Sequence, residues 1–392
     1  MNKNVPEIRF QGFHDDWEQR KVRELFTVTR GQVLAVSEVS SIKTLVNPYP
    51  VYSSQTKNNG LLGYYHDYLF DGGITWTTDG ANAGTVKYRN GKFYSTNVNG
   101  VLLSNDGYMN KSIAEILNKS AWKYVSHVGN PKLMNNVMSD IKIEIPTKIS
   151  EQKNLSGLID KIDNLITLHQ RKLNLLQEQK KSLLQKMFPK KDEKIPEIRF
   201  NGFTDDWEQR KLGEVADIVG GGTPSTTEED YWNGDIDWYT PAEIGDSIYV
   251  SHSKKTITKL GLSKSSAKLL PVGTILFTSR AGIGNTAILG KISTTNQGFQ
   301  SIVPDENRLD TYFIFSLSKM LKKYGEKMGA GSTFLEVSGK TMSKMTIYLP
   351  DVVEQHQIGT FLKHFDNLIT LHQRKLDALQ EQKKGLLQKM FV

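Results

Sequence analysis

Residues 163–188 read DNLITLHQRKLNLLQEQKKSLLQKMF, and residues 366–391 read DNLITLHQRKLDALQEQKKGLLQKMF. The two stretches are identical at 23 of 26 positions, lack proline and contain one glycine, Gly385. Apolar residues recur in both at alternating intervals of three and four, which predicts a long helix with one apolar seam. Because such a seam is buried only against another helix, each copy is expected to pack on the other in a coiled coil. The expected seam positions are Ile159, Ile162, Ile166, His169, Leu173, Leu176, Leu183 and Met187 in the first copy, and Leu362, Phe365, Ile369, His372, Leu376, Leu379, Leu386 and Met390 in the second.

Polar side chains interrupt each seam at two positions, His169 and Lys180 in the first copy and His372 and Lys383 in the second. A metal site on the two histidines would need two further ligands, so no metal is expected. The histidines are interpreted as a polar layer that fixes the register of the coil.

A second repeat sets the organisation of the chain. Residues 6–22 and 196–212 match at 14 of 17 positions, from PEIRF to DDWEQRK. The expected order is a domain at 1–150, a helix at 151–188, a linker at 189–195, a second domain at 196–353 and a second helix at 354–392. A pseudo-twofold relation between the halves makes the helices antiparallel and holds the domains apart. It also predicts that Val392 ends close to residue 6, as Phe188 lies close to residue 196.

Composition limits the class of protein. The 392 residues exceed one core and indicate at least two domains. A net charge of +8 and a pI of about 9.2 favour an acidic partner, nucleic acid before an anionic membrane. No apolar run approaches the ~20 residues of a membrane span, and MNKNVPEIRF lacks a signal-peptide core. The absence of cysteine excludes disulfides and thiolate sites, so we expect a cytoplasmic protein without membrane contact.

The interiors of the two halves read as mixed α/β (α+β) domains. Short β-prone runs bounded by turn residues predict strands at 73–78, 85–88, 141–145, 237–240, 274–278 and 346–349. A helix is expected near 310–325, with Asp310 as its N-cap. Trp76 and Trp238 are expected in the core.

With these features the chain resembles the specificity subunits of Type I restriction–modification systems. The resemblance covers nearly the whole chain and rests on the duplicated PEIRF…DDWEQRK, the duplicated EQ…DNLITLHQRKL…LLQKMF and two divergent interiors. The second interior adds GGGTPS at 220–225, TTNQGFQSIVP at 294–304, and GSTF followed by a strand ending in YLP at 331–350.

The resemblance implies a non-catalytic, sequence-specific DNA-binding subunit with two target-recognition domains, separated by the antiparallel coiled coil. Each domain would read one half of a bipartite site in double-stranded DNA. It also implies two modification (methyltransferase) subunits that methylate adenine, and restriction subunits that carry the nuclease and translocase. No cofactor is expected in this chain, whereas S-adenosylmethionine, ATP and magnesium are expected on the partners.

Candidate DNA contacts are basic and amide side chains on turns. In the second interior, lysines interleaved with Ser and Thr suit phosphate contact, while Arg280, Asn296 and Gln297 lie on glycine-bounded turns. Arg reads guanine and Asn or Gln reads adenine in the major groove, but such side chains also support turn backbone, and both interpretations stay open. The candidates are Thr77, Thr78, Asn82, Lys87, Arg89, Lys92, Asn97 and Asn99 in the first interior, and Lys254, Lys255, Lys259, Lys264, Lys268, Arg280, Asn296 and Gln297 in the second.

Two other classes of function fit parts of the sequence less well. A tandem-domain protein–protein scaffold without DNA specificity would explain the duplication but leave the positive charge unused. A self-sufficient methyltransferase or nuclease is disfavoured, because Asn47-Pro-Tyr-Pro50 differs from the Asn-Pro-Pro-aromatic motif and no glycine-rich cofactor loop follows a strand. No catalytic residue is therefore expected in this chain.

Overall fold

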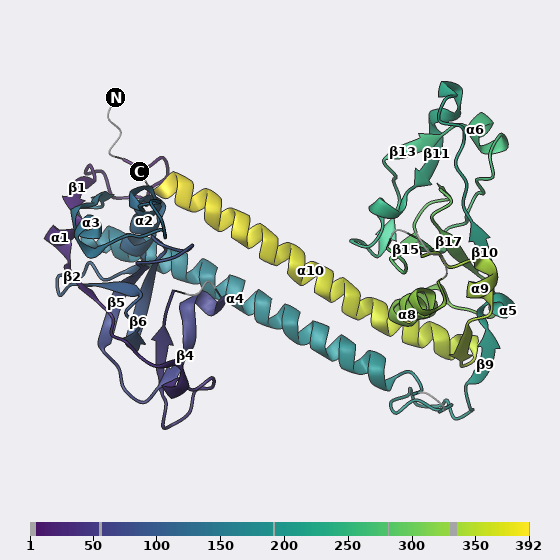
Figure 1. Ribbon diagram of the computed structural model, residues 1–392, viewed down its shortest axis with the longest axis horizontal. Helices are drawn as coiled ribbons and strands as arrows, with labels where there is room; N and C mark the ends of the chain where they lie inside the picture. The colour runs from purple at the N-terminus through teal and green to yellow at the C-terminus, as the bar shows by residue number, and fades with distance from the viewer. Residues whose placement is uncertain (1–4, 55–56, 191–192, 281, 330–334, 392) are drawn as a thin grey trace. The chain divides into compact units, whose positions relative to one another are not determined.

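A computed structural model describes residues 5–54, 57–190, 193–280, 282–329 and 335–391. The chain divides into two compact units, one formed by Met1–Arg171 with Gln373–Val392 and the other by Lys172–His372. The two repeated stretches lie in the long helices α4 (Ile149–Lys186) and α10 (Val352–Met390), each of which runs through both units (Figure 1). Residues 191–192 of the predicted linker lie outside the described residues, and so does Val392 at the end of the predicted second helix.

The first unit is a mixed α/β domain around one six-stranded sheet of order β2-β7-β5-β6-β3-β4, with β3 and β6 parallel and the other neighbours antiparallel. Gly100 is required in β7, since a Cβ there would lie 2.0 Å from the Trp76 ring. Trp76 is fully buried, as expected, and packs in one core with Ile74, Leu102 and helix α2. The elements are β1 Glu18–Lys21, α1 Val22–Leu25, β2 Thr27–Arg30, η1 Val36–Glu38, β3 Tyr49–Tyr52, η2 Lys57–Gly60, β4 Leu61–Tyr65, β5 Phe70–Thr77, β6 Val86–Ser95, β7 Asn99–Leu103, α2 Lys111–Ala121, η3 Trp122–Tyr124, α3 Asn135–Asp140 and β8 Lys142–Ile145.

The second unit has a five-stranded sheet, β10-β17-β14-β15-β12, and a three-stranded sheet, β13-β11-β16. Trp238 is buried, with 5% of its surface exposed, and its ring packs edge-on against the ring of Trp232. The ring N–H of Trp238 donates to the Gly222 carbonyl at 2.8 Å. The elements are β9 Glu208–Lys211, α5 Leu212–Val215, β10 Ala216–Gly220, η4 Glu229–Tyr231, β11 Trp232–Tyr239, η5 Pro241–Glu243, β12 Tyr249–Val250, β13 Lys255–Ile257, α6 Lys259–Ser263, β14 Ile275–Phe277, β15 Thr286–Leu289, β16 Thr294–Thr295, β17 Gln300–Pro304, α7 Thr311–Ser316, α8 Ser318–Met328, α9 Gly339–Ser343 and β18 Thr346–Leu349.

The helix expected over 310–325 is two helices. Asp310 is the N-cap of α7, and its side chain accepts a hydrogen bond from the Phe313 N–H at 2.8 Å. Helix α7 ends at Ser316, because the ψ of 11° at Leu317 leaves the helical region, and α8 begins at Ser318. Tyr312, Phe313 and Ile314 of the first segment and Leu321 of the second are buried in the same core.

The repeated N-terminal segments build the same small sheet in both units. Strand β1 pairs antiparallel with β8, and β9 pairs with β18 in the same way. A tryptophan directly precedes the first strand of each pair: Trp17 precedes β1 and Trp207 precedes β9. Both tryptophans are almost fully buried. In the second unit the Phe313 ring centroid lies 5.7 Å from that of Trp207 and 5.3 Å from that of Phe188 at the end of α4.

Buried ion pairs attach these segments to the long helices. Arg9 donates two hydrogen bonds to Glu151, at 2.6 and 2.8 Å, and Arg199 donates two to Glu354, at 2.7 and 2.8 Å. The Glu151 and Glu354 side chains are 1% and 0% exposed. The acidic residue of each first helical turn is therefore a partner for the repeated arginine as well as a match to the helix dipole.

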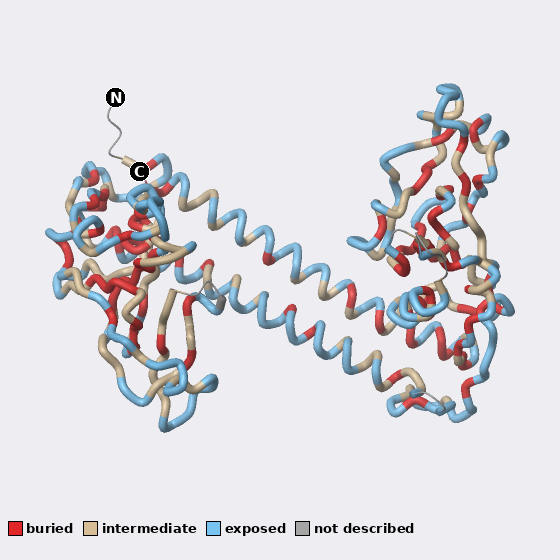
Figure 2. The backbone as a smooth tube through the Cα atoms, in the orientation of Figure 1, coloured by how far each residue is buried: buried red, intermediate tan, exposed pale blue. Residues whose placement is uncertain are grey.

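The long helices run antiparallel where they meet inside each unit. In the first unit Leu155 and Ile159 of α4 share a core with Leu386 and Met390 of α10. In the second unit the corresponding cluster contains Met187, directly after α4, with Ile358 and Leu362 of α10. Along the helices most other residues are exposed (Figure 2). The seam positions are buried at Ile159, Ile162, Leu173, Leu176, Met187, Leu362, Leu376 and Met390, and half-buried at Ile166, His169, Leu183, Phe365, Ile369, His372, Leu379 and Leu386.

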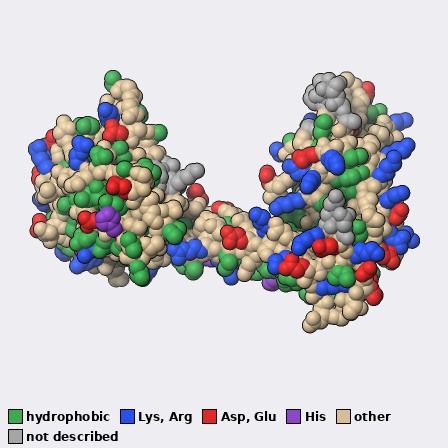
Figure 3. All heavy atoms as spheres, turned by 60° about the horizontal axis from the view of Figure 1, so that its bottom comes forward, with side chains coloured by type: hydrophobic (Ala, Val, Ile, Leu, Met, Phe, Trp, Pro, Cys, Tyr) green, Lys and Arg blue, Asp and Glu red, His purple; other side chains and the backbone are tan. Residues whose placement is uncertain are grey.

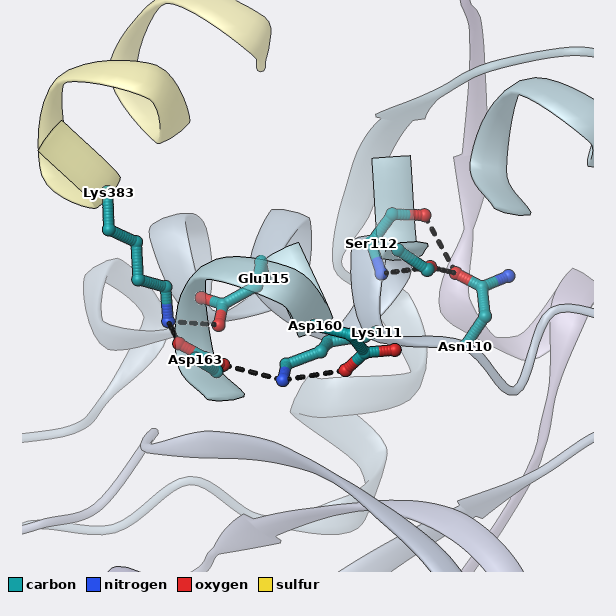
Figure 4. Close-up of polar contacts among 8 residues, drawn as sticks. Asn110, Lys111, Ser112, Glu115, Asp160, Asp163 and Lys383 are labelled. Carbon is teal, nitrogen blue, oxygen red and sulfur yellow. Dashed lines mark hydrogen bonds and ion pairs between the residues drawn. The ribbon is translucent and has the colours of Figure 1, made fainter. Parts of the chain in front are cut away.

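The lysines that interrupt the seams are ion-paired with aspartates of the facing helix. Lys383 lies 2.9 Å from Asp163 and 3.4 Å from Glu115 in the first unit (Figure 4). Lys111 bridges the same Asp163 to Asp160, at 2.5 and 2.9 Å. Asp163 belongs to the repeated DNLI sequence and Lys383 to the repeated QKK sequence, so the repeat carries both members of this pair.

The second unit holds the equivalent pair. Lys180 lies 2.5 Å from Asp366, and the Tyr312 hydroxyl donates to the other carboxylate oxygen at 2.7 Å. Burial and then the neighbouring Asp366 charge raise the pKa of Tyr312 far above its ordinary value, so this hydroxyl remains a hydrogen-bond donor.

Each long helix ends against the start of a repeated segment in its own unit. The Ile8 N–H donates to the Lys389 carbonyl at 3.0 Å, and the Ile198 N–H donates to the Lys186 carbonyl at 2.9 Å. The same lysines pair with Glu7 and Glu197, at 3.4 and 2.7 Å. The region just before Val392 is thus bound beside the region just after residue 6.

We expect a circular permutant that joins residue 392 to residue 1 through a short Gly/Ser linker and reopens the chain within 189–195 to fold normally. The hydrogen bonds at residues 8 and 198 fix both junctions whichever one is covalent, and exposed junctions tolerate such changes. Circular dichroism and thermal unfolding should match the parent chain. Recovery of only unfolded or insoluble permutant would contradict this arrangement.

Among the described residues, every helix is too short or too polar to cross a membrane.

Candidate nucleic-acid interface

Three segments of the first unit meet at one end of the central sheet, and we call them the first recognition turns: 77–85, 96–99 and 131–133. The Thr78 N–H donates to the Val98 carbonyl at 3.0 Å, and the Thr78 carbonyl accepts from the Leu133 N–H at 2.8 Å. The Gly84 N–H closes the first turn on the Thr77 carbonyl at 2.9 Å, with a φ of +84° at Gly84. The turns that carry Thr77, Thr78, Asn82, Asn97 and Asn99 are therefore held side by side.

The second unit repeats this arrangement with different residues, in the second recognition turns: 278–280 with 282–285, 295–299 and 335–337. The Ser279 N–H donates to the Gly298 carbonyl at 2.8 Å, and the Ser279 carbonyl accepts from the Val337 N–H at 3.0 Å. The Gly284 N–H again closes the first turn, here on the Thr278 carbonyl at 2.9 Å. Ala281 and the 330–334 part of the GSTF stretch lie outside the described residues.

A polar cleft of about 200 Å³ opens beside the first recognition turns. Five of the eight predicted contacts of this unit, Thr77, Asn82, Lys87, Arg89 and Asn99, line it. The other lining residues are also small or polar: Ser53, Ser54, Asn59, Gly60, Thr75 and Thr85. Thr78 and Asn97 lie on the turns themselves, whereas Lys92 is apart from the cleft and places its ammonium 4.4 Å from the centre of the Tyr68 ring.

The Arg89 side chain lies at the floor of this cleft and does not project from the surface. It is 6% exposed, and its guanidinium lies 3.7 Å over the Tyr52 ring. The guanidinium donates to the Thr75 hydroxyl at 3.1 Å and to the Asn59 carbonyl at 2.9 Å. Burial lowers the pKa of Arg89 to about 10, and no carboxylate of the described residues pairs with it. Its charge therefore makes the cleft attractive to an anion without reaching far beyond the surface.

Lys87 lies beside Arg89 on the same strand and is half-buried. Burial lowers the pKa of Lys87, and the nearby Glu115 charge acts in the opposite direction. Because two partly desolvated cations share one cleft, its potential is positive under neutral conditions.

The lysine candidates of the second unit are all exposed. Lys254, Lys255, Lys259, Lys264 and Lys268 follow one another through β13, α6 and the loop after it. Lys and Arg side chains are spread over the face of this unit that Figure 3 shows. Exposed lysines of this kind suit contact with phosphates, which are spread along both DNA strands.

The amide candidates of the second recognition turns differ from each other. The Asn296 side-chain oxygen accepts a hydrogen bond from the Gly298 N–H at 2.8 Å, so this atom supports its own turn. Gln297 is exposed, and its amide oxygen accepts from the Thr223 hydroxyl. Of the two interpretations left open for these residues, turn support applies to the Asn296 oxygen, and Gln297 is the better placed for an external ligand.

Sequence reasoning missed part of this surface. Residues 39–66 contain four tyrosines, two lysines and no Asp or Glu, and this stretch supplies Ser53, Ser54, Asn59 and Gly60 to the cleft. A run of 28 residues without a carboxylate is a signal of nucleic-acid contact that the sequence offers directly. Asp79, Lys132 and Glu336 on the recognition turns were also missed. The two acids were missed because only cations, amides and hydroxyls were predicted as contacts.

Nothing in the described residues groups three or more His, Asp or Glu side chains in a way that would hold a metal ion. Asn47, in the Pro-containing stretch compared with methyltransferases, instead closes a turn, since its N–H donates to the Thr44 hydroxyl at 2.9 Å.

Comparison with known proteins agrees with this architecture. The sequence profile of the Type I restriction modification DNA specificity domain matches residues 14–178 and 204–381. The Type I restriction enzyme MjaIX specificity subunit of Methanocaldococcus jannaschii is 36% identical over 190 residues, which span 48% of this chain and 44% of that protein. The putative MjaX specificity subunit of the same organism is 23% identical over 95% of this chain and 92% of its own length.

A solved structure shares the fold over the full length. The S subunit of a Type I restriction–modification system from M. genitalium superposes with a TM-score of 0.72, at 16% identity, and covers 99% of both chains. The two profile matches together include most of the chain and coincide with its two halves. The chain therefore belongs to the family of Type I restriction–modification DNA specificity subunits, which are the non-catalytic, DNA-recognising components of these systems.

Proposed function

We propose that this chain recognises a bipartite site in double-stranded DNA, with one half-site read by each unit. The observation that carries this proposal is the repeated recognition-turn framework: the same main-chain hydrogen bonds at Thr78 and Ser279 present different side chains in the two units. Two readers built on one scaffold but with different surfaces suit two different half-sequences.

Phosphate contacts in this proposal come from the exposed lysines 254–268, and the cleft floored by Arg89 supplies a recessed positive site in the first unit. Direct base contacts come from the recognition turns, where Gln297 and Arg280 are partly or fully exposed. Sorting contacts in this way separates affinity, which the lysines support, from sequence preference, which the turns support.

The partners follow from the family. We infer that the chain assembles with two modification subunits, which bind S-adenosylmethionine and methylate adenine in the site, and with restriction subunits that use ATP and magnesium. The repeated segments favour two copies of one partner, because exposed aspartates of the DDWEQRK sequence occur in each unit, Asp15 and Asp16 in the first and Asp205 and Asp206 in the second. We place this complex in the cytoplasm, where the DNA lies.

We expect binding to a duplex that contains the site to weaken steeply with salt. With about six phosphates neutralised, affinity should fall roughly a thousandfold between 50 and 200 mM salt. Fluorescence anisotropy with the partner-bound chain measures this slope, and sequencing of methylated adenines in cells that carry the complex gives the site. A charge-reduced control, Lys254→Gln with Lys255→Gln, should lower the slope without altering the site.

A continuous, non-split motif would contradict the proposal. Negligible binding to any duplex at low salt would instead favour the protein–protein scaffold that the duplication also allows.

A further inference from the structure

Each set of recognition turns carries one exposed ion pair, and the two pairs have opposite polarity. In the first unit Asp79 Oδ1 lies 3.8 Å from Lys132 Nζ. In the second unit Arg280 Nη1 lies 3.8 Å from Glu336 Oε2. The acid stands on the first turn in one unit and on the third segment in the other.

The four residues occupy equivalent positions. Asp79 directly follows Thr78, the residue that hydrogen-bonds both neighbouring segments, and Arg280 directly follows Ser279, which makes the same two bonds. Lys132 precedes Leu133, and Glu336 precedes Val337, the donors of those bonds. The main chain is therefore shared, and only the charges have exchanged places.

The hydroxyl that precedes each charged residue, on Thr78 or Ser279, has different hydrogen bonds in the two units, because the next side chain is an acid in one and a base in the other. The Thr78 hydroxyl donates to Asp79 Oδ2 at 2.7 Å, which orients the carboxylate while Oδ1 faces Lys132. The equivalent hydroxyl, on Ser279, is buried and finds no hydrogen-bond partner among the described residues. An arginine at the next position offers no acceptor, which explains the difference.

These pairs are weak compared with what DNA offers the same groups. The side chains of Asp79 and Lys132 are 35% and 51% exposed, and those of Arg280 and Glu336 are 34% and 42% exposed. An exposed ion pair shifts an equilibrium by about fivefold at most, whereas a good paired contact with a base edge shifts it by about ten- to a hundredfold. DNA would therefore open both pairs, which until then keep the side chains at the surface.

We propose that residues 79 and 280 are equivalent base-reading positions with opposite chemistry. Arg280 donates to O6 and N7 of a guanine, and Asp79 accepts from the N4 amino group of a cytosine, in the major groove. Each unit thus reads one G·C pair in its own half-site. The second unit contacts the guanine of its pair, and the first unit contacts the cytosine of its pair. The proposal rests on the proposed function, since it assigns residues to bases within a bipartite site.

The decisive test compares the two members of one pair. If the pair only fastened the third segment, Arg280→Gln and Glu336→Gln would have the same effect, because each breaks it. If Arg280 reads guanine, Arg280→Gln lowers the discrimination for G at one position of one half-site by about ten- to a hundredfold. Glu336→Gln keeps that preference and raises affinity by up to about fivefold, because nothing then competes with DNA for the arginine.

The readout is the set of methylated-adenine motifs in cells that carry the chain with its partner subunits, together with anisotropy titrations on duplexes altered at one base pair. Arg280→Lys is the charge-matched control: it keeps the salt slope but loses the G preference, because an ammonium lacks the guanidinium fork. In the other unit, Asp79→Asn should relax a C position in the other half-site, while the half-site read by the second unit stays unchanged.

Equal effects of Arg280→Gln and Glu336→Gln, or a motif unaltered by Arg280→Gln and Asp79→Asn, would overturn the assignment while leaving bipartite recognition intact. Absence of any split motif for the unmodified chain would instead count against the proposed function itself.

Discussion

Replacing Arg199 by Met should destabilise the second unit by about 3–5 kcal/mol, the usual cost of leaving a buried charge without its counterion. Glu354 is fully buried, and both its oxygens accept hydrogen bonds from the Arg199 guanidinium. The hydrogen bonds that Arg199 donates to Glu354, and then the negative charge of Glu354, raise the pKa of Arg199, so the arginine stays charged at any pH where the protein is folded. Urea unfolding followed by tryptophan fluorescence would show the loss, since Trp207 lies on the same repeated segment.

The control for this substitution is the double variant Arg199→Met with Glu354→Gln. Removing the carboxylate charge as well should recover a large part of the loss, because a neutral amide is far less costly to bury. The repeat offers a second control, since Arg9→Met leaves Glu151 in the same position in the first unit. An Arg199→Met protein that unfolds within about 0.5 kcal/mol of the parent would show that this pair is not a structural anchor.

Replacing Asp366 by Asn should cost more stability than replacing Asp163 by Asn, although the two aspartates occupy the same place in the repeat. Asp366 is the only carboxylate found beside Lys180 in the described residues, and it also accepts from the Tyr312 hydroxyl. We expect about 3 kcal/mol for Asp366→Asn, within the range for breaking a buried pair. In the first unit Lys383 keeps Glu115 and Lys111 keeps Asp160, so Asp163→Asn should cost about 1 kcal/mol.

Acid titration gives a second readout for Asp163. Burial by itself would raise the pKa of Asp163, but hydrogen bonds from Lys111 and Lys383 outweigh it and hold the pKa below its ordinary value. Stability from this carboxylate is therefore present above its unfolded pKa, about 3.9, and is lost as pH falls through the lower folded value. The Asp163→Asn chain should lack this part of the acid transition. Equal losses for the two substitutions, at every pH, would contradict the different roles of the two networks.

The repeated helices were predictable because identical sequence with a regular apolar period leaves few alternatives. Their fold class, long antiparallel helices with two mixed α/β domains, is confirmed by the structure and by the family match. The lysines within the seams, in contrast, interrupt the apolar pattern, and the pattern alone does not show what they contact. Only the register of the facing helix shows that Lys180 meets Asp366, and a single sequence does not give the register between two segments about 190 residues apart.

The candidate interface was predictable in part. Turn chemistry located the segments around Thr78 and Asn97 and around Arg280 and Gln297, since glycine-bounded turns are visible in sequence. Burial was not visible: Arg89 lies under Tyr52, a residue far away in the chain, and so becomes a floor instead of a projecting contact. Because only cations, amides and hydroxyls were predicted as contacts, the acids were overlooked, although a carboxylate is the natural acceptor for an amino group on a base.

The domains predicted at 1–150 and 196–353 remain predictions, and the compact units are drawn differently. Each unit includes a part of both long helices, so Gln373–Val392 belongs with the N-terminal part of the chain. Met390 and Phe391 are buried in the same core as Trp17, and the rings of Phe391 and Trp17 lie 6.3 Å apart.

This composite construction orders events during protein synthesis. While the ribosome is still making the second unit, the first has every strand of its sheet but lacks the segment that covers Trp17. A nascent chain stopped before residue 373 would present that uncovered apolar surface to chaperones and proteases. The first core is therefore complete only after residues 373–391 have been synthesised.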